Sequence, residues 1–159
     1  MIVQPAPLTI YLAGPISGLS YEAVVDRYKT YVPALRDIGF NVIFPMTAKG
    51  YLRNEIKFKA HGDANPVSTN GAIVGRDEWM VHQCDILVAD LAAATERVSI
   101  GTVCEISWAH LLHKHILVTM TEENFHHHAF ILEQAHIILP SMSEILEYLT
   151  EVQLAEHAL

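Results

Sequence analysis

One wholly apolar run, bounded by two acids, restricts the fold of this chain more than any other feature. Residues 86–89 read Ile-Leu-Val-Ala and stand between Asp85 and Asp90. A strand with no polar position has no face to turn toward solvent, which is the situation of strands in parallel sheets that helices cover on both sides. The run therefore predicts a central strand of an α/β fold.

The rest of the chain alternates strands with helices. Apolar runs predict further strands at residues 8–13, 41–44, 115–120 and 136–139. Apolar residues at helical spacing predict helices at residues 21–38, 71–84 and 141–155 and another around Glu105. On the helix at 71–84, Ile73, Trp79 and Met80 are expected to face inward. Such alternation implies a five-stranded parallel sheet with right-handed crossovers, whose ligands bind beyond the carboxyl ends of the strands.

Length and composition favour one compact domain, residues 1–159, because 51% of the residues are hydrophobic. No stretch is long and apolar enough to span a bilayer, and the first nine residues lack a signal-type core. We therefore expect a cytoplasmic protein without membrane contact. Cys84 and Cys104 form no CxxC pair, which predicts reduced, packed thiols.

The net charge of −8 argues against a nucleic-acid partner, because affinity for a polyanion comes from clustered cations. A small anion remains open, since the amides of a helix N-terminus hold one phosphate without a basic side chain. Neither the run of histidines at 126–128 nor His110, His113 and His115 gives an i, i+4 pair with a third ligand. We expect a solvated turn and a helix end at these places, and no metal or cofactor.

Glu105 is the candidate that the strand pattern positions most clearly. It follows the strand at 86–89, and the apolar positions around it recur at helical spacing, so we expect it in a first helical turn. There the helix dipole and unpaired amides favour the ionised carboxylate, which is the form a nucleophile needs. A structural alternative is a capping box, with Thr102 as N-cap and Glu105 bonded back to its amide. The spacing alone leaves both interpretations open.

Three other features follow strand ends or lie beside them. These are Tyr11 with the loop at 14–18, Asp77 on the helix that leads to the strand at 86–89, and Ser99. Each has an ordinary explanation, as a core tyrosine and a turn, a solvated charge, and a loop hydroxyl. Together with Glu105 they supply a carboxylate, a hydroxyl to orient it, a second acid and an amide-rich loop, a set that suits displacement at a sugar carbon.

The sequence resembles the nucleoside 2-deoxyribosyltransferase superfamily from residue 8 to about residue 118. The matching segments are residues 10–15 (Ile-Tyr-Leu-Ala-Gly-Pro), Asp77, the strand at 85–90 and residues 101–109 (Gly-Thr-Val-Cys-Glu-Ile-Ser-Trp-Ala). The resemblance implies a flavodoxin-like, Rossmann-like three-layer α/β sandwich. It also implies an enzyme that cleaves the bond between a nucleobase and C1′ of a ribose or deoxyribose.

The same resemblance implies roles for individual residues. Glu105 is the expected nucleophile, which attacks C1′ to form a glycosyl ester. Tyr11 holds its carboxylate, and Asp77 contacts the base or assists its protonation. A fixed anion beneath the ring stabilises an oxocarbenium-like transition state. Gly14 and Gly101 are assigned to substrate binding with the segments that contain them.

Ser99 stands where relatives that act on free nucleosides have an aspartate that binds the 5′-hydroxyl. An aspartate repels a 5′-phosphate, whereas a serine hydroxyl donates to it. This exchange is similar to the branch of nucleoside 5′-monophosphate N-glycosidases, which includes the CMP and hydroxymethyl-CMP hydrolases. In that branch the amides after the first strand, here those of Ile16, Ser17 and Gly18, hold the phosphate. The expected reaction releases free base and (deoxy)ribose 5-phosphate; base exchange between deoxynucleosides and nucleotide binding without turnover are the alternatives.

The segment at residues 45–71 is too irregular for one element and is expected to be a lid or binding loop that faces the base. Lys49, Tyr51, Arg53 and Asn54 are its candidate base contacts, with exposure to solvent as the simpler expectation for each. The resemblance also implies a homodimer or higher homo-oligomer whose sites borrow a residue from the neighbouring subunit. His128 lies at the matching place.

Overall fold

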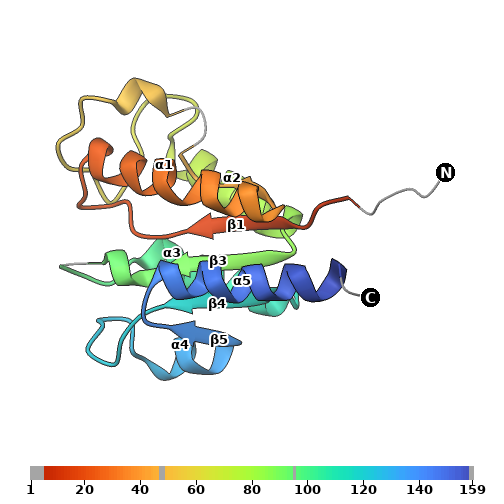
Figure 1. The fold of residues 1–159 in the computed structure, drawn as a ribbon. Helices are drawn as coiled ribbons and strands as arrows, with labels where there is room; N and C mark the ends of the chain where they lie inside the picture. The colour runs from red at the N-terminus through yellow and green to blue at the C-terminus, as the bar shows by residue number, and fades with distance from the viewer. Residues whose placement is uncertain (1–5, 47–48, 95, 158–159) are drawn as a thin grey trace.

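The computed structural model describes residues 6–46, 49–94 and 96–157. Its centre is a five-stranded sheet in the order β2-β1-β3-β4-β5 (Figure 1). The strands are β1 (Thr9–Ala13), β2 (Asn41–Ile43), β3 (Ile86–Asp90), β4 (His115–Thr119) and β5 (Ile137–Leu139). All neighbouring strands are parallel, which confirms the sheet predicted from the apolar runs.

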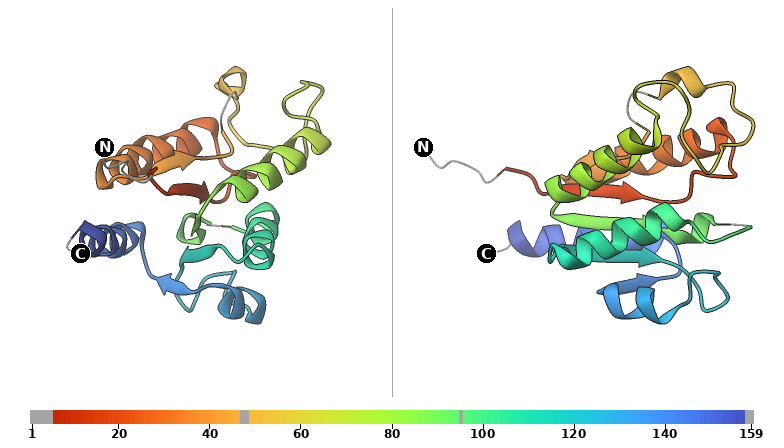
Figure 2. Two further views of the ribbon diagram at one scale, coloured as in Figure 1. Left: turned by 90° about the vertical axis from the view of Figure 1, so that its right-hand side faces the viewer. Right: turned by 180° about the vertical axis from the view of Figure 1, so that it is seen from behind.

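Helices cover both faces of the sheet and complete a three-layer α/β sandwich, as Figure 2 shows from two further sides. The helices are α1 (Tyr21–Ile38), α2 (Asn70–Gln83), α3 (Ile100–Leu111), α4 (Ala129–Gln134) and α5 (Met142–His157), with short 3-10 turns η1 (Gly50–Leu52) and η2 (Leu91–Ala93). The apolar spacing does not predict α4, because six residues are too few to show a helical period.

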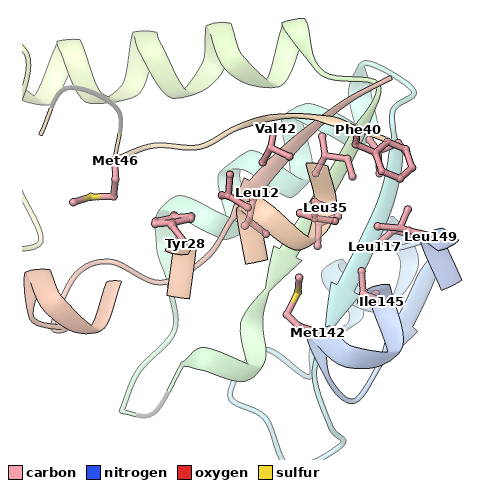
Figure 3. Close-up of a cluster of buried hydrophobic side chains, with 14 of the residues drawn as sticks. Leu12, Tyr28, Leu35, Phe40, Val42, Met46, Leu117, Met142, Ile145 and Leu149 are labelled. Atoms are coloured by element: carbon pink, nitrogen blue, oxygen red, sulfur yellow. The ribbon is translucent and has the colours of Figure 1, made fainter. Parts of the chain in front are cut away.

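Alternation along β1 divides its side chains between two cores. Ile10 and Leu12 pack in the core beneath α1 and α5, where Figure 3 shows Leu12 among the side chains of both helices. Tyr11 packs on the opposite face with residues of α2, α3 and α4. The strand therefore carries the Tyr11 side chain toward α3 and away from α1.

The strand order creates a crevice at the carboxyl edge of the sheet. The chain leaves β1 through α1 on one face and leaves β3 through α3 on the other, although β1 and β3 are hydrogen-bonded neighbours. The loops that follow these two strands thus diverge to opposite faces. In open parallel sheets this switch point is the usual place for a ligand.

Two expectations about exposure are wrong. Trp79 is 59% exposed because α2 turns Met80 and Val81 toward the sheet, which places Trp79 about 150° around the helix from the middle of the buried face. Cys84 is buried as expected, whereas Cys104 on α3 is exposed. Among the described helices, none is both long and apolar enough to cross a membrane.

Candidate functional site

The centre of the candidate site is a contact between β1 and α3. The Tyr11 hydroxyl donates to Oε1 of Glu105 at 2.6 Å, and both side chains are buried. Burial, and next the Glu105 charge, raises the pKa of Tyr11 well above its ordinary value, so the hydroxyl stays protonated and remains a donor. This contact joins residues 94 positions apart in the sequence.

Glu105 lies deeper in its helix than the spacing suggests. α3 begins at Ile100 with Ser99 as N-cap, which puts Glu105 in the second turn. The capping box with Thr102 is therefore wrong: Thr102 is inside the helix, and its hydroxyl contacts the Ser99 hydroxyl at 2.9 Å. The carboxyl of Glu105 is free of any capping duty and is held by Tyr11 instead.

The raised pKa of Glu105 contradicts the expectation that its carboxylate is ionised. Burial raises the pKa of Glu105 to about 8; the bond from Tyr11 opposes this shift and the charge of Asp77 adds to it. The helix dipole does not prevent this, because its effect is concentrated in the first turn, which Glu105 does not occupy. Burial therefore favours the protonated form of this carboxyl at neutral pH.

Asp77 on α2 is the second acid of the cluster. Burial raises the pKa of Asp77, against the charges of Arg76 and Lys49. A guanidinium nitrogen of Arg76 lies 3.1 Å from Oδ1 of Asp77, and the Asp77 side chain is only 13% exposed. Asp77 is thus a half-buried acid in electrostatic contact with Glu105, and the expectation of a solvated helix charge does not hold.

Lys49 lies beside Asp77 and Glu105, although we expected it to be exposed to solvent. Only 6% of this residue is exposed. Burial lowers the pKa of Lys49, and the charges of Asp77 and Glu105 oppose that shift. Its neighbours Tyr51, Arg53 and Asn54 are exposed, as expected. Lys49 is therefore the member of this set that the 45–71 segment brings to the carboxyls.

Ser99 is held in place by a histidine that the sequence did not single out for this role. The Ser99 amide donates to Nε2 of His126 at 2.7 Å. Nδ1 of the same ring lies 2.8 Å from Oδ1 of Asn124, whose amide nitrogen donates to the Leu91 carbonyl. An Nε2 that accepts from a backbone amide carries no proton, so His126 is neutral with its proton on Nδ1. The expected solvated turn is wrong here, since His126 is 2% exposed.

The loop after β1 differs from the expected phosphate cradle at one position. The Gly18 amide donates to the Phe58 carbonyl at 2.8 Å and is not available to a ligand. Ile16 and Ser17, in contrast, have amides with no acceptor among the described residues, and the Ser17 hydroxyl donates to the Lys59 carbonyl. Gly18 has a φ of +88°, a backbone conformation that residues with a Cβ rarely adopt. The turn therefore explains why a glycine stands at this position.

A hollow lies in the crevice between the loops after β1 and β3. Its lining from the first loop is Pro15, Ser17, Gly18 and Leu19, and from the second Ala93, Ala94, Glu96 and Arg97. Arg97 packs so closely over Gly18 that an added Cβ would lie 2.9 Å from its guanidinium. Gly101, which the family resemblance assigns to substrate binding, is the second residue of α3 and is exposed.

Sequence reasoning missed Arg27, on the second turn of α1. Its guanidinium covers Gly14, where an added Cβ would lie 3.2 Å from Cζ.

His128 caps α4 by accepting from the Phe130 amide and is exposed, a position that neither supports nor excludes a contact with a second subunit. In the described parts of the chain, no three His, Cys, Asp or Glu side chains gather closely enough to hold a metal ion.

Comparisons with known proteins agree on the fold. A conserved protein from Enterococcus faecalis V583 superposes with a TM-score of 0.65 at 19% identity, over 92% of this chain and 99% of that one. The CMP N-glycosidase BcmB of Clostridium botulinum gives 0.54 at 20% identity, over 89% and 97% of the chains. A 2-deoxyribosyltransferase of Bacillus psychrosaccharolyticus gives 0.59 at 19% identity, over 87% and 90%. The flavodoxin-like fold is thereby confirmed.

The family itself is shown by the sequence. No curated protein matches the chain. The family model for nucleoside 2-deoxyribosyltransferases, however, matches residues 10–144, which include every residue of the cluster around Glu105. The chain therefore belongs to the nucleoside 2-deoxyribosyltransferase family and is an enzyme of nucleoside chemistry, of the N-glycosidase or deoxyribosyltransferase type.

Proposed function

We propose that the protein hydrolyses the N-glycosidic bond of nucleoside 5′-monophosphates and releases free base and sugar 5-phosphate. The observation that carries the proposal is the buried contact of Tyr11 with Glu105, with Asp77 close enough to influence the pKa of both. An oriented carboxyl beside a second acid is the equipment of a double displacement at an anomeric carbon.

In the first step Glu105 attacks C1′. Tyr11 occupies Oε1, which leaves Oε2 for the attack. The C1′–N bond breaks, its electron pair passes to the base, and Asp77 gives the base a proton. A protonated base leaves far more readily than an anion, so the proton on Asp77 lowers the barrier.

In the second step a water molecule attacks C1′ of the ester. Its proton passes to the ionised Asp77, the C1′–O bond breaks, and Glu105 leaves as a carboxylate. The pair then again holds the single proton with which it began. This cycle requires one proton shared between Asp77 and Glu105. Burial raises the pKa of both carboxyls, and a raised pKa favours the protonated form that such sharing needs.

Ser99 supports a monophosphate over a free nucleoside. It is the N-cap of α3, its side chain does not cap the helix, and the first helical bond is donated by Val103 to the Ser99 carbonyl. The amides of Ile100, Gly101 and Thr102 therefore have no partner within the helix. A hydroxyl beside three such amides favours a phosphate oxygen, because donors and the helix dipole act together.

Product analysis tests the proposal. The protein is incubated with each common ribo- and deoxyribonucleoside and with its 5′-monophosphate, and free base is measured by chromatography. We expect base from one or more monophosphates, little from the matching nucleosides, and none with Glu105→Gln. Addition of a second free base distinguishes hydrolysis from transfer: formation of a new nucleoside would identify a transferase, and absence of any base release would contradict both.

A further inference from the structure

Arg27 is a partly buried cation without an acid. The ion pairs of the described residues are Lys29 with Asp26, Lys57 with Glu96 and Arg76 with Asp77. The buried Nε of Arg27 has no hydrogen-bond partner, and the single bond that its guanidinium makes within the described chain is a long one of 3.5 Å to the Tyr28 hydroxyl. A buried N–H donor of a charged group without a partner is costly unless a ligand supplies an acceptor.

The guanidinium lies at the end of β1, one residue before Pro15, which lines the hollow. It covers Gly14, the residue directly after the strand, and stacks over the Tyr28 ring with its Cζ 5.1 Å from the ring centroid. A side chain at position 14 would contact the guanidinium closely, so the packing of Arg27 explains why a glycine stands there. A cation–π contact of this kind engages the face of the guanidinium and does not use its N–H donors.

Arg27 approaches the crevice from the face opposite Glu105. α1 packs on the core of Ile10 and Leu12, whereas Glu105 contacts Tyr11 on the other face. The charge of Arg27 nevertheless lowers the pKa of Glu105. The two charges therefore interact across the end of β1.

Two guanidinium groups lie beside the loop after β1, that of Arg97 over Gly18 and that of Arg27 over Gly14. Arg97 is exposed, whereas Nε of Arg27 is buried without a hydrogen-bond partner. Gly18 gives its amide to Phe58, so only the Ile16 and Ser17 amides remain of the three expected donors. Two amides leave a dianion largely uncompensated, whereas a guanidinium supplies both charge and paired donors. We propose that Arg27 binds the phosphate monoester of the substrate and determines the preference for nucleotides over nucleosides.

This inference rests on the proposed function for the identity of the ligand, but its test does not require turnover. Ribose 5-phosphate and ribose are titrated into wild type, Arg27→Gln and Arg27→Lys, and binding is followed by calorimetry and by the shift in Tm. Arg36→Gln is the matched control, since Arg36 is an exposed arginine in the last turn of the same helix. Circular dichroism establishes that each variant is folded.

We expect Arg27→Gln to weaken ribose 5-phosphate at least tenfold and Arg27→Lys to weaken it less, with Arg36→Gln unchanged. Where base is released, kcat/KM for the monophosphate should fall by a similar factor while that for the nucleoside holds. Undiminished binding of ribose 5-phosphate by folded Arg27→Gln would overturn the inference. Absence of base release by wild type would refute the proposed function alone, because the binding titration is read separately.

Discussion

Glu105 should weaken the folded protein at the pH where it works, and Glu105→Gln should show by how much. The carboxyl is 5% exposed, and its pKa rises from 4.5 in an open chain to about 8 in the fold. Each pH unit between those two values costs the folded state about 1.4 kcal/mol, because the unfolded chain ionises first. A glutamine has the same shape and the same acceptor for Tyr11, but no charge to bury.

The sign follows from the direction of the shift. A carboxyl whose pKa is raised by folding contributes most stability below pH 4.5, where both states are protonated, and loses it as the pH rises to about 8. Between pH 5 and pH 7.5 the free energy of unfolding of wild type should therefore fall by about 3 kcal/mol relative to Glu105→Gln. The amide NH₂ of the variant adds an unsatisfied donor that costs about 1–3 kcal/mol, but this penalty does not depend on pH.

Urea unfolding of both proteins at several pH values between 5 and 8 measures this difference. Glu133→Gln, a change at an exposed position of α4, is the control and should run parallel to wild type. Parallel curves for Glu105→Gln as well would mean that Glu105 is ionised in the folded protein at neutral pH. The argument that burial controls this carboxyl would then be refuted.

Four further outcomes follow from the site. The kcat/KM for a monophosphate should be bell-shaped in pH with its alkaline limb near pH 8, where the second carboxyl ionises, and Asp77→Asn should lower the maximum and abolish that limb. Ser99→Asp should cut monophosphate turnover about a hundredfold while nucleoside cleavage holds or improves, since only the phosphate is repelled; an unchanged ratio removes Ser99 from the 5′ end. His126→Phe should raise KM for the monophosphate about fivefold through the lost bond to Ser99, with partial recovery in His126→Gln and no effect of His127→Ala; a change confined to kcat contradicts this. Exposed Val74, Trp79, Leu111 and Phe130 favour a dimer or larger oligomer, and sedimentation that finds monomer alone at micromolar concentration would exclude a borrowed His128.

The sheet could be predicted from the sequence because its signals are local. Residues 86–89 have no polar position, and the acids on either side limit the run to the length of a strand. The state of Glu105 could not be predicted in this way. Thr102 and Glu105 satisfy a capping pattern, but Ser99 and Thr102 compete for the same helix start, and the bond from Tyr11 comes from 94 residues away.

His126 and Arg27 are two further residues whose partners could not be predicted from the sequence. A run of three histidines reads as a solvated turn, and only the Ser99 amide, 27 residues distant, makes one of them a buried acceptor. An arginine on an amphipathic helix reads as a surface charge, and only the absence of an acid near its guanidinium within the described chain makes it unusual. Periodicity reports which face a residue occupies, whereas its partners depend on the whole fold.

The strand order gives the proposed substrate a direction. Glu105 and Asp77 act from the face of α2 and α3, and Arg27 reaches the β1 end from the face of α1. A ligand that engages all three must therefore cross the carboxyl edge of β1, with its anionic end toward α1 and its leaving group toward α2. A nucleoside 5′-monophosphate has this polarity, since C1′ separates the base from the phosphate-bearing carbon. A free nucleoside has no phosphate to pair with Arg27. The binding energy of the contact between the phosphate and the guanidinium is therefore available only to the nucleotide.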